Sequence, residues 1–223
     1  MALIIFDCDG TLVDSQHVIA HCMAGAFKAE GLPAPDLVAV RRVVGLSLVR
    51  AVAMLAPDLP EATCERIAER YKELFRFKRA EGGTIEPLYP NVRETLEALE
   101  AAGHLLAVAT GKSRRGLDLV LAHHDLARYF VSLQTADTHP SKPHPAMLRQ
   151  ALAETGAVAG DALMVGDTSF DMTMAQNAGI AGIGVAYGYH APAELIAAGA
   201  RRVLDDIGEL VGLLAEERKD STV

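Results

Sequence analysis

Two aspartates follow an apolar run near the start of the chain. The segment FDCDGTLVDS places Asp7 and Asp9 directly after the strand-like residues 2–6, with Gly10 and Thr11 next. Such a strand delivers both carboxylates to the carboxyl edge of a parallel sheet. One carboxylate can act as a nucleophile, and the other can exchange a proton with the attacking or leaving oxygen. A solvated acidic turn is the alternative, and the strand before the pair and the Gly-Thr after it disfavour that reading.

Thr110, Gly111 and Lys142 lie after later apolar runs. Thr110 and Gly111 end the run LLAVAT, where a hydroxyl and backbone N–H groups can bind phosphate oxygens. Lys142 lies in a polar Ser-Lys-Pro loop, from which a lysine can neutralise charge on a transferred phosphoryl group. Each signal is weak alone, because Thr-Gly pairs occur in ordinary turns and a loop lysine usually faces solvent. Lys112 and the arginines that follow it can likewise form a solvated basic face.

Two more aspartates come after the apolar run ALMVG. Asp167 ends this run and would complete a cation site with the first acidic pair, and Asp171 follows one helical turn later. Magnesium suits such a site, because it takes oxygen ligands, needs few protein carboxylates and keeps several waters. Alternatively, Asp167 caps the next helix and Asp171 lies in its first turn, aligned with the helix dipole. Both roles can coexist for Asp171.

Short apolar runs that alternate with helix-patterned stretches predict the elements that carry these residues. The predicted strands are 2–6, 105–110, 131–135, 162–166 and 181–186, and the predicted helices between them include 92–102, 145–155 and 192–198. Alternation of strands and helices predicts an α/β fold, with a Rossmann-like parallel sheet covered by helices on both faces.

The region from 15 to 87 has a different character. It contains only helical patterns, among them 16–30, 46–56 and 61–81, separated by glycines and prolines. We therefore predict a Rossmann-like core made of residues 1–14 and 88–223, and an inserted all-helical domain at 15–87.

Composition narrows the possible partners. The 223 residues carry a formal net charge of −8 without a cluster of Lys and Arg, which argues against nucleic acid. No apolar run reaches the roughly 18 residues of a membrane span, so we expect no membrane partner. The three cysteines show no disulfide or zinc spacing and are expected to be buried thiols. The N-terminus lacks the pattern of a signal peptide, so a cytoplasmic location is the default expectation, and no oligomeric state is predicted.

The histidines offer a weaker metal hypothesis. His17 and His21 are four residues apart, which is compatible with a metal site, but no third ligand is apparent in the sequence. We expect a surface or interdomain face for this pair.

In their order along the chain, the motifs DxDGT, TGK, KP and GDTxxD resemble those of the haloacid dehalogenase-like hydrolases, over essentially the whole length. The helical insertion is similar to the cap of the branch that contains phosphoglycolate phosphatases and phosphoglucomutases. The resemblance implies a Rossmann-like core, a hinged helical cap and a site where the two meet.

The resemblance also implies a role for each matching residue. Asp7 matches the nucleophile, and Asp9 matches the acid/base that also offers its backbone carbonyl to magnesium. Thr110 and Gly111 match the phosphate-binding positions, and Lys142 matches the charge-stabilising lysine. In the last motif, Asp167 matches a metal ligand, and Asp171 matches a supporting acid that is metal-linked or adjacent to a ligand. In the cap, Arg41 with Val44-Gly45-Leu46 resembles an arginine-containing stretch.

The implied activity is that of a magnesium-dependent phosphatase that acts on a small phosphorylated metabolite through an aspartyl-phosphate. Phosphoglycolate is the first candidate, because a cap limits size and Arg41 can pair with a carboxylate. Asp9 disfavours a dehalogenase, which lacks this second acid. A phosphomutase stays open, if a closed cap excludes water. A non-enzymatic phospho-accepting receiver is disfavoured by the large insertion and by Asp9, and multiple turnover on a phosphate ester would decide.

Overall fold

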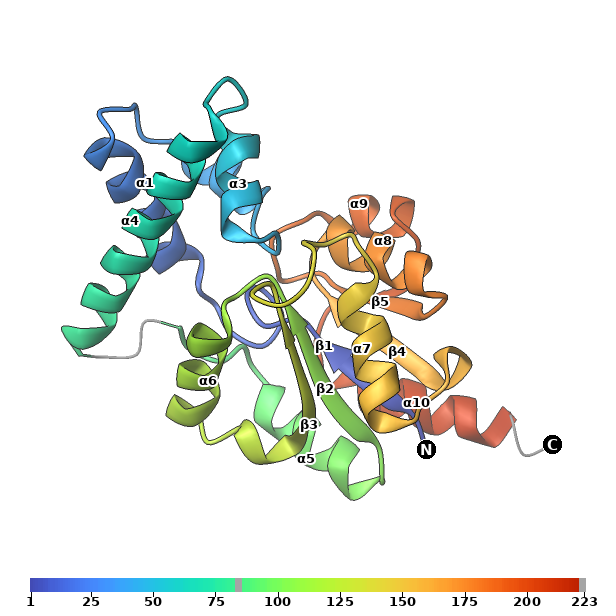
Figure 1. Ribbon diagram of the computed structural model, residues 1–223. Coiled ribbons are helices and arrows are strands. Elements are labelled where there is room, and N and C mark those ends of the chain that lie inside the picture. Colours follow the sequence, from blue (N-terminus) through green and yellow to red (C-terminus); the bar gives the residue numbers. More distant parts are fainter. Residues whose placement is uncertain (83–85, 221–223) are drawn as a thin grey trace.

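A computed structural model describes residues 1–82 and 86–220 (Figure 1). Its centre is a six-stranded sheet, in the order β3-β2-β1-β4-β5-β6, in which all neighbouring strands are parallel. The strands are β1 (Leu3–Phe6), β2 (Leu105–Thr110), β3 (Phe130–Thr135), β4 (Ala162–Gly166), β5 (Ala181–Val185) and β6 (Ala200–Leu204).

Helices cover both faces of this sheet. They are α5 (Val92–Ala101), α6 (Arg114–His123), α7 (Ala146–Thr155), α8 (Ser169–Ala178), α9 (Pro192–Ala197) and α10 (Glu209–Asp220), with 3₁₀ turns at Ala127–Tyr129 and Ala159–Asp161. Successive residues of a strand point to opposite faces. In β1, Ile4 and Phe6 accordingly pack with α5, α6 and α10, whereas Leu3 and Ile5 pack with α7 and α8. The predicted fold class is confirmed.

Five of the six strands were predicted with nearly the observed bounds, and the sixth was missed. β2 and β4 have the predicted bounds, and β1, β3 and β5 differ from them by one residue at one end. β6 was not predicted, because it lies at the edge of the sheet and Arg201 and Arg202 in its centre are exposed, which interrupts its apolar pattern.

The region before β2 also holds a group of helices that stands apart from the sheet (Figure 1). These helices are α1 (Gln16–Ala29), α2 (Leu37–Arg41), α3 (Leu48–Leu55) and α4 (Glu61–Ala80). They enclose a core of their own, in which Met23 and Phe27 of α1 pack with Val52 of α3 and Ile67 of α4. The five-residue helix α2 was not predicted, because one turn and a half carries too little periodicity. We call α1 to α4 and their connections the helical segment.

Two stretches of chain join the helical segment to the sheet, and they run side by side. The backbone N–H of Asp14 donates to the carbonyl of Pro87 over 2.8 Å, and that of Tyr89 donates to Leu12 over 3.1 Å. This pairing is compatible with a boundary after residue 14 and another near 87, although residues 83–85 of the predicted insertion lie outside the described part. The boundaries themselves stay a prediction. Among the helices that the structure describes, none combines the length and the apolar character needed to cross a membrane.

The three cysteines are all free and buried, as expected. His17 and His21 are both exposed on α1, so the expectation of a surface face holds for this pair.

Candidate active site

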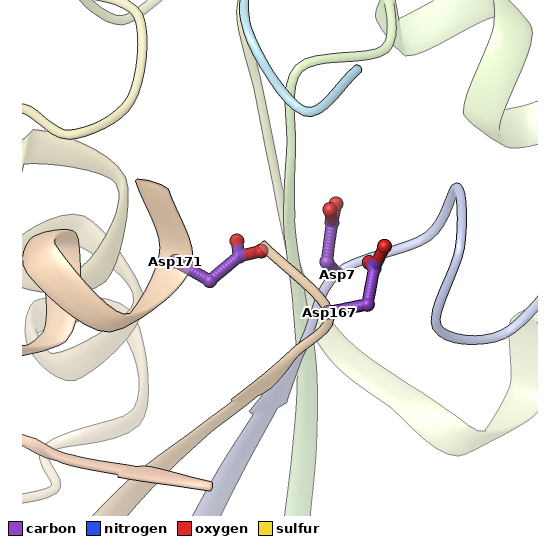
Figure 2. A group of neighbouring side chains, drawn as sticks. All are labelled: Asp7, Asp167 and Asp171. Atoms are coloured by element: carbon purple, nitrogen blue, oxygen red, sulfur yellow. The ribbon is translucent and has the colours of Figure 1, made fainter. Parts of the chain in front are cut away.

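Three carboxylates meet at the carboxyl edge of the sheet. Asp7 follows β1 and Asp167 follows the neighbouring strand β4, so strand pairing alone brings their backbones together. Asp171 reaches toward them from the first turn of α8 (Figure 2). One carboxylate oxygen of each of the three lies within 4.8 Å of the other two, and all three side chains are buried. The structure thus gathers three of the four aspartates singled out in the sequence.

Backbone turns and short hydrogen bonds fix Asp167. Its Oδ1 accepts from the hydroxyl of Thr11 at 2.8 Å, and its Oδ2 accepts from the backbone N–H of Tyr189 at 2.9 Å. Gly10 has a φ of 87°, and a Cβ at this position would lie 2.2 Å from Asp167 Oδ2. Only glycine fits both the conformation and the space. Asp167 does not cap α8, because the cap residue is Thr168.

A buried lysine lies between two of the carboxylates. The Nζ of Lys142, whose side chain has no exposure, is 2.9 Å from Asp7 Oδ1 and 2.6 Å from Asp171 Oδ1. Burial alone would lower the pKa of Lys142, but Asp171 and Asp7 raise it above its ordinary value, so the ammonium stays charged. Lys142 is therefore buried between Asp7 and Asp171, and the solvent-facing alternative is wrong.

Asp7 has one engaged oxygen and one free oxygen. Oδ1 accepts from the backbone N–H of Cys8 at 2.7 Å and faces Lys142, whereas Oδ2 is buried without a hydrogen-bond partner. Burial raises the pKa of Asp7 to about 7, with Asp171 and Asp9 adding to the rise and Lys142 opposing it. Burial also raises the pKa of Asp167, and Asp7 and Asp171 raise it further.

These raised pKa values mean that the positive charge of Lys142 does not offset the negative charge of the three neighbouring carboxylates. Three buried carboxylates with hard oxygen donors, one of them unpartnered, are what a divalent cation such as Mg²⁺ needs. The residues present therefore fit the predicted ion. The Asp9 carboxylate is outside the group of three, and the resemblance assigned its backbone carbonyl, not its side chain, to the metal.

Asp171 has two engaged oxygens. Oδ1 accepts from Lys142, and Oδ2 accepts from the backbone N–H of Thr168 at 3.1 Å and from its hydroxyl at 2.7 Å. The hydroxyl of Thr168 in turn accepts from the Asp171 N–H, which makes a capping box at the start of α8. The structure thus gives Asp171 two tasks, to begin α8 and to hold Lys142.

Asp9 faces a second lysine. Its Oδ1 accepts from the hydroxyl of Ser15 at 2.6 Å and lies 2.9 Å from the Nζ of Lys112. The same Nζ is 2.9 Å from Oε1 of Glu86, which also pairs with Arg79 of α4. Burial lowers the pKa of Lys112, but Asp9 and Glu86 more than offset this, so Lys112 is charged.

The reading of Lys112 as part of a solvated face is wrong. Its side chain is only 9% exposed, whereas Arg114 and Arg115 are exposed as that reading expects. The partner that buries Lys112, Glu86, lies 26 residues away in the stretch that leads back from the helical segment, and no local pattern points to it. The one feature of the sequence that could have indicated a role for Lys112 is its position next to Gly111 in the TGK motif.

A loop of the helical segment closes over this edge of the sheet. A Cβ on Gly111 would lie 2.4 Å from the carbonyl oxygen of Gly45, and a Cβ on Gly45 would lie 3.9 Å from Asp7 Oδ2. The backbone N–H of Ser47 donates to the hydroxyl of Ser141 at 2.8 Å, next to Lys142. Thr110 is buried at the end of β2, and its Oγ1 accepts from the Lys112 N–H at 3.2 Å. The helical segment therefore lies directly against Gly111 and Ser141, at the edge of the sheet that holds Asp7.

Arg41 reaches a different part of the site. Its Nη2 donates to the carbonyl of Gly188 at 3.1 Å, and its guanidinium lies 5.8 Å from the ring centroid of Tyr189, while Nε is buried without a partner. Because the Tyr189 N–H binds Asp167, Arg41 contacts the loop that supports the acidic cluster. Its predicted role toward a substrate carboxylate stays a prediction.

The fold and the site together define a class of protein: a parallel α/β enzyme with an acidic cluster and buried lysine at its strand ends, covered by an inserted helical segment. Residues 4–185 match the family model of the haloacid dehalogenase-like hydrolases. The phosphoglycolate phosphatase of Vibrio parahaemolyticus is 34% identical over 96% of both chains, and the probable phosphatase IndB of Dickeya dadantii is 37% identical over 94% of this chain and 92% of that one. A crystal structure of a predicted phosphatase from Clostridium acetobutylicum, 27% identical, superposes with a TM-score of 0.87 over 96% of this chain and 98% of that chain.

The chain belongs to the haloacid dehalogenase-like hydrolase family. The relatives confirm the resemblance to the phosphoglycolate phosphatase-like branch and the prediction of an enzyme of the phosphatase kind.

Proposed function

We propose that the protein is a magnesium-dependent phosphatase that hydrolyses a small phosphate monoester through an aspartyl-phosphate on Asp7. One observation carries this proposal. Asp7 Oδ2 is buried and has no hydrogen-bond partner, while Oδ1 accepts from the Cys8 N–H and lies 2.9 Å from the Lys142 ammonium. An oriented carboxylate with one free oxygen next to a fixed positive charge is suited to attack phosphorus.

The chemistry proceeds in two displacements. In the first, an oxygen of Asp7 forms a bond to phosphorus, the bond to the leaving oxygen breaks, and Asp9 donates a proton to that oxygen. In the second, water attacks phosphorus while Asp9 takes its proton, and the bond to Asp7 breaks to release inorganic phosphate. Lys142 offsets the negative charge on the transferred group, and Thr110 and the Gly111 backbone hold its oxygens.

Magnesium would be held by Asp7 and Asp167, with the backbone carbonyl of Asp9, and Asp171 would support the site through Lys142. When bound, the ion supplies positive charge that reduces the repulsion between these carboxylates and the phosphate. The raised pKa values of Asp7 and Asp167 in the free protein support this need for a cation.

Phosphoglycolate is the first compound to test, because curated relatives of the chain carry the name phosphoglycolate phosphatase. The close approach of Gly45 to Gly111 and Asp7 supports a small substrate, since a protein or nucleic acid would have to displace the helical segment. A partner that is a small phosphorylated metabolite fits this geometry.

The test is phosphate release from phosphoglycolate and from p-nitrophenyl phosphate, with chelator and with magnesium added back. Asp7→Asn should abolish release, because an amide is a poor nucleophile. Asp14→Asn is the matched control from the same motif. Among the described residues the Asp14 carboxylate accepts from Gln16 of α1, and the side-chain oxygen of an asparagine can still accept from the Gln16 N–H. Activity that survives chelation, or an active Asp7→Asn enzyme, would falsify the proposal. Transfer of phosphate to a second hydroxyl of the same substrate, without release, would instead indicate a mutase.

A further inference from the structure

A cavity of about 660 Å³ lies between the helical segment and the carboxyl edge of the sheet. Its wall on the sheet side includes Asp9, Gly111 and Lys112. The wall on the side of the helical segment is largely apolar, and includes Met23 of α1, Val44 and Leu48 around the start of α3, and Tyr71 and Phe75 of α4. No step of the proposed mechanism uses these apolar side chains.

We infer that this cavity binds the leaving group, and that the preferred substrate is a phosphate monoester of an alcohol with an apolar body, branched or aromatic, larger than glycolate. This inference rests on the proposed function and specifies its substrate class.

The position of Asp9 gives the direction in which the substrate lies. In the first displacement Asp9 donates a proton to the leaving oxygen, so that oxygen must lie next to its carboxylate. Asp9 itself lines the cavity, as does Gly111, whose backbone is proposed to hold the phosphate. The carbon atoms attached to the leaving oxygen therefore continue into the cavity, toward α1 and α4.

The charges along the wall favour an apolar body over an anionic one. Two cations of the wall are already paired with carboxylates, Lys112 with Asp9 and Glu86, and Arg79 with Glu86, although Nη1 of Arg79 is buried without a hydrogen-bond partner. Phe75 covers Lys112, with its ring centroid 5.3 Å from Nζ. Arg76 and Arg115, which also line the cavity, are exposed to solvent, and the lining Lys72 pairs with Glu69. A carboxylate placed beside Met23, Val44 or Leu48 would lose its hydration without gaining a partner.

The size of the cavity also favours a substrate with a body larger than glycolate. Pockets of roughly 300–1,000 Å³ typically enclose ligands of drug size, whereas glycolate is a two-carbon acid. Arg41, the predicted partner of a glycolate carboxylate, is not among the residues that line the cavity and donates instead to Gly188.

The experiment compares kcat/KM for ethyl, butyl, hexyl and 2-phenylethyl phosphate and for phosphoglycolate, with magnesium present. The alkyl alcohols have nearly the same acidity, so the series varies the apolar body alone. Burial of a methylene corresponds to about a fourfold gain. We expect hexyl and 2-phenylethyl phosphate to exceed both ethyl phosphate and phosphoglycolate by at least about tenfold. A flat or falling series would overturn the inference.

A variant that fills the cavity gives a second readout. Leu48→Trp places a larger side chain in the wall, and should reduce the ratio of kcat/KM for hexyl phosphate to that for ethyl phosphate by about tenfold. Val38→Trp is the matched control, because Val38 is 67% exposed on α2 and does not line the cavity. An unchanged ratio in Leu48→Trp would contradict the assignment, and the alkyl series on the unmodified protein decides the matter if this variant does not fold.

The outcomes separate the inference from the function on which it rests. If no ester in the set, p-nitrophenyl phosphate included, releases phosphate with magnesium, both fail. If the esters are hydrolysed but phosphoglycolate or ethyl phosphate is preferred, the phosphatase proposal stands and the substrate class is wrong.

Discussion

Replacement of Lys142 by methionine removes the one ammonium that contacts Asp7 among the residues that the structure describes. In the structure its Nζ is 2.9 Å from Asp7 and 2.6 Å from Asp171, and none of the three side chains is exposed to solvent. Removal of one partner from a buried ion pair typically costs about 3–5 kcal/mol, because the remaining charge is buried and uncompensated. A domain of this length loses roughly 2–4 °C of melting temperature per kcal/mol. Lys142→Met should therefore melt roughly 6–20 °C below the unmodified protein.

The size of this effect should depend on pH. Lys142 lowers the pKa of Asp7 and burial raises it, with the balance near 7. At pH 8 the variant leaves a buried carboxylate without its partner. At pH 5 Asp7 is protonated in both proteins, so less attraction is lost and the difference in melting temperature should shrink.

Thermal denaturation followed by circular dichroism, in chelator at pH 5 and pH 8, measures both effects. Lys78→Met is the control, because Lys78 forms a comparably short pair with Glu81 on the exposed end of α4 and its loss should leave the melting temperature nearly unchanged. The double variant Lys142→Met/Asp171→Asn should melt above Lys142→Met, since it removes one of the two uncompensated charges. A shift for Lys142→Met as small as that for Lys78→Met at pH 8 would refute the buried pair.

Three further predictions concern the metal and two neighbours of the acidic cluster. Burial raises the pKa of Asp7 from 3.8 to about 7 in the free protein, so its stabilising contribution is complete below about pH 4 and is lost as the pH rises through 7. Magnesium binds the deprotonated carboxylate, so it should raise the melting temperature more at pH 8 than at pH 5.5, and equal shifts would contradict the linkage. Gly10→Ala should lower both melting temperature and activity, since the added Cβ would lie 2.2 Å from Asp167 Oδ2; Gly212→Ala in α10, with nothing within 4 Å, should do neither. Lys112→Met should lower kcat more for an alkyl phosphate, which needs a proton from Asp9, than for p-nitrophenyl phosphate, with the exposed Lys28→Met as control; equal losses would show that Lys112 does not act through Asp9.

The residues at strand ends were predictable because the signal is local. An apolar run that stops at an aspartate or threonine indicates where the strand ends, and it also indicates which side chain lies at the edge of the sheet. Asp7, Thr110 and Asp167 were placed in this way, and the parallel pairing of β1 with β2 and β4 then brings them together. Asp171 followed from Asp167 by one turn of helix.

The contacts that the sequence did not show join segments that are distant along the chain. Glu86 binds Lys112, and Tyr189 binds Asp167 through its backbone, across 26 and 22 residues respectively. Both depend on where the helical segment and the loop after β5 lie, which no periodicity encodes. The cavity is a further case, because its walls come from the helical segment, from α6 and from the loops after β1, β2 and β3.

The central claim, that Asp7 carries the phosphoryl group and Asp9 moves the protons, is tested by mass spectrometry of rapidly quenched enzyme. Asp9→Asn mixed with p-nitrophenyl phosphate and magnesium should accumulate one phosphoryl group, because water attack without a base slows by a factor on the order of 10²–10⁴. Peptide mapping should place the label on Asp7, and Asp7→Asn should never be labelled. A label on Asp9, unaltered turnover in Asp9→Asn, or activity in Asp7→Asn would contradict the account.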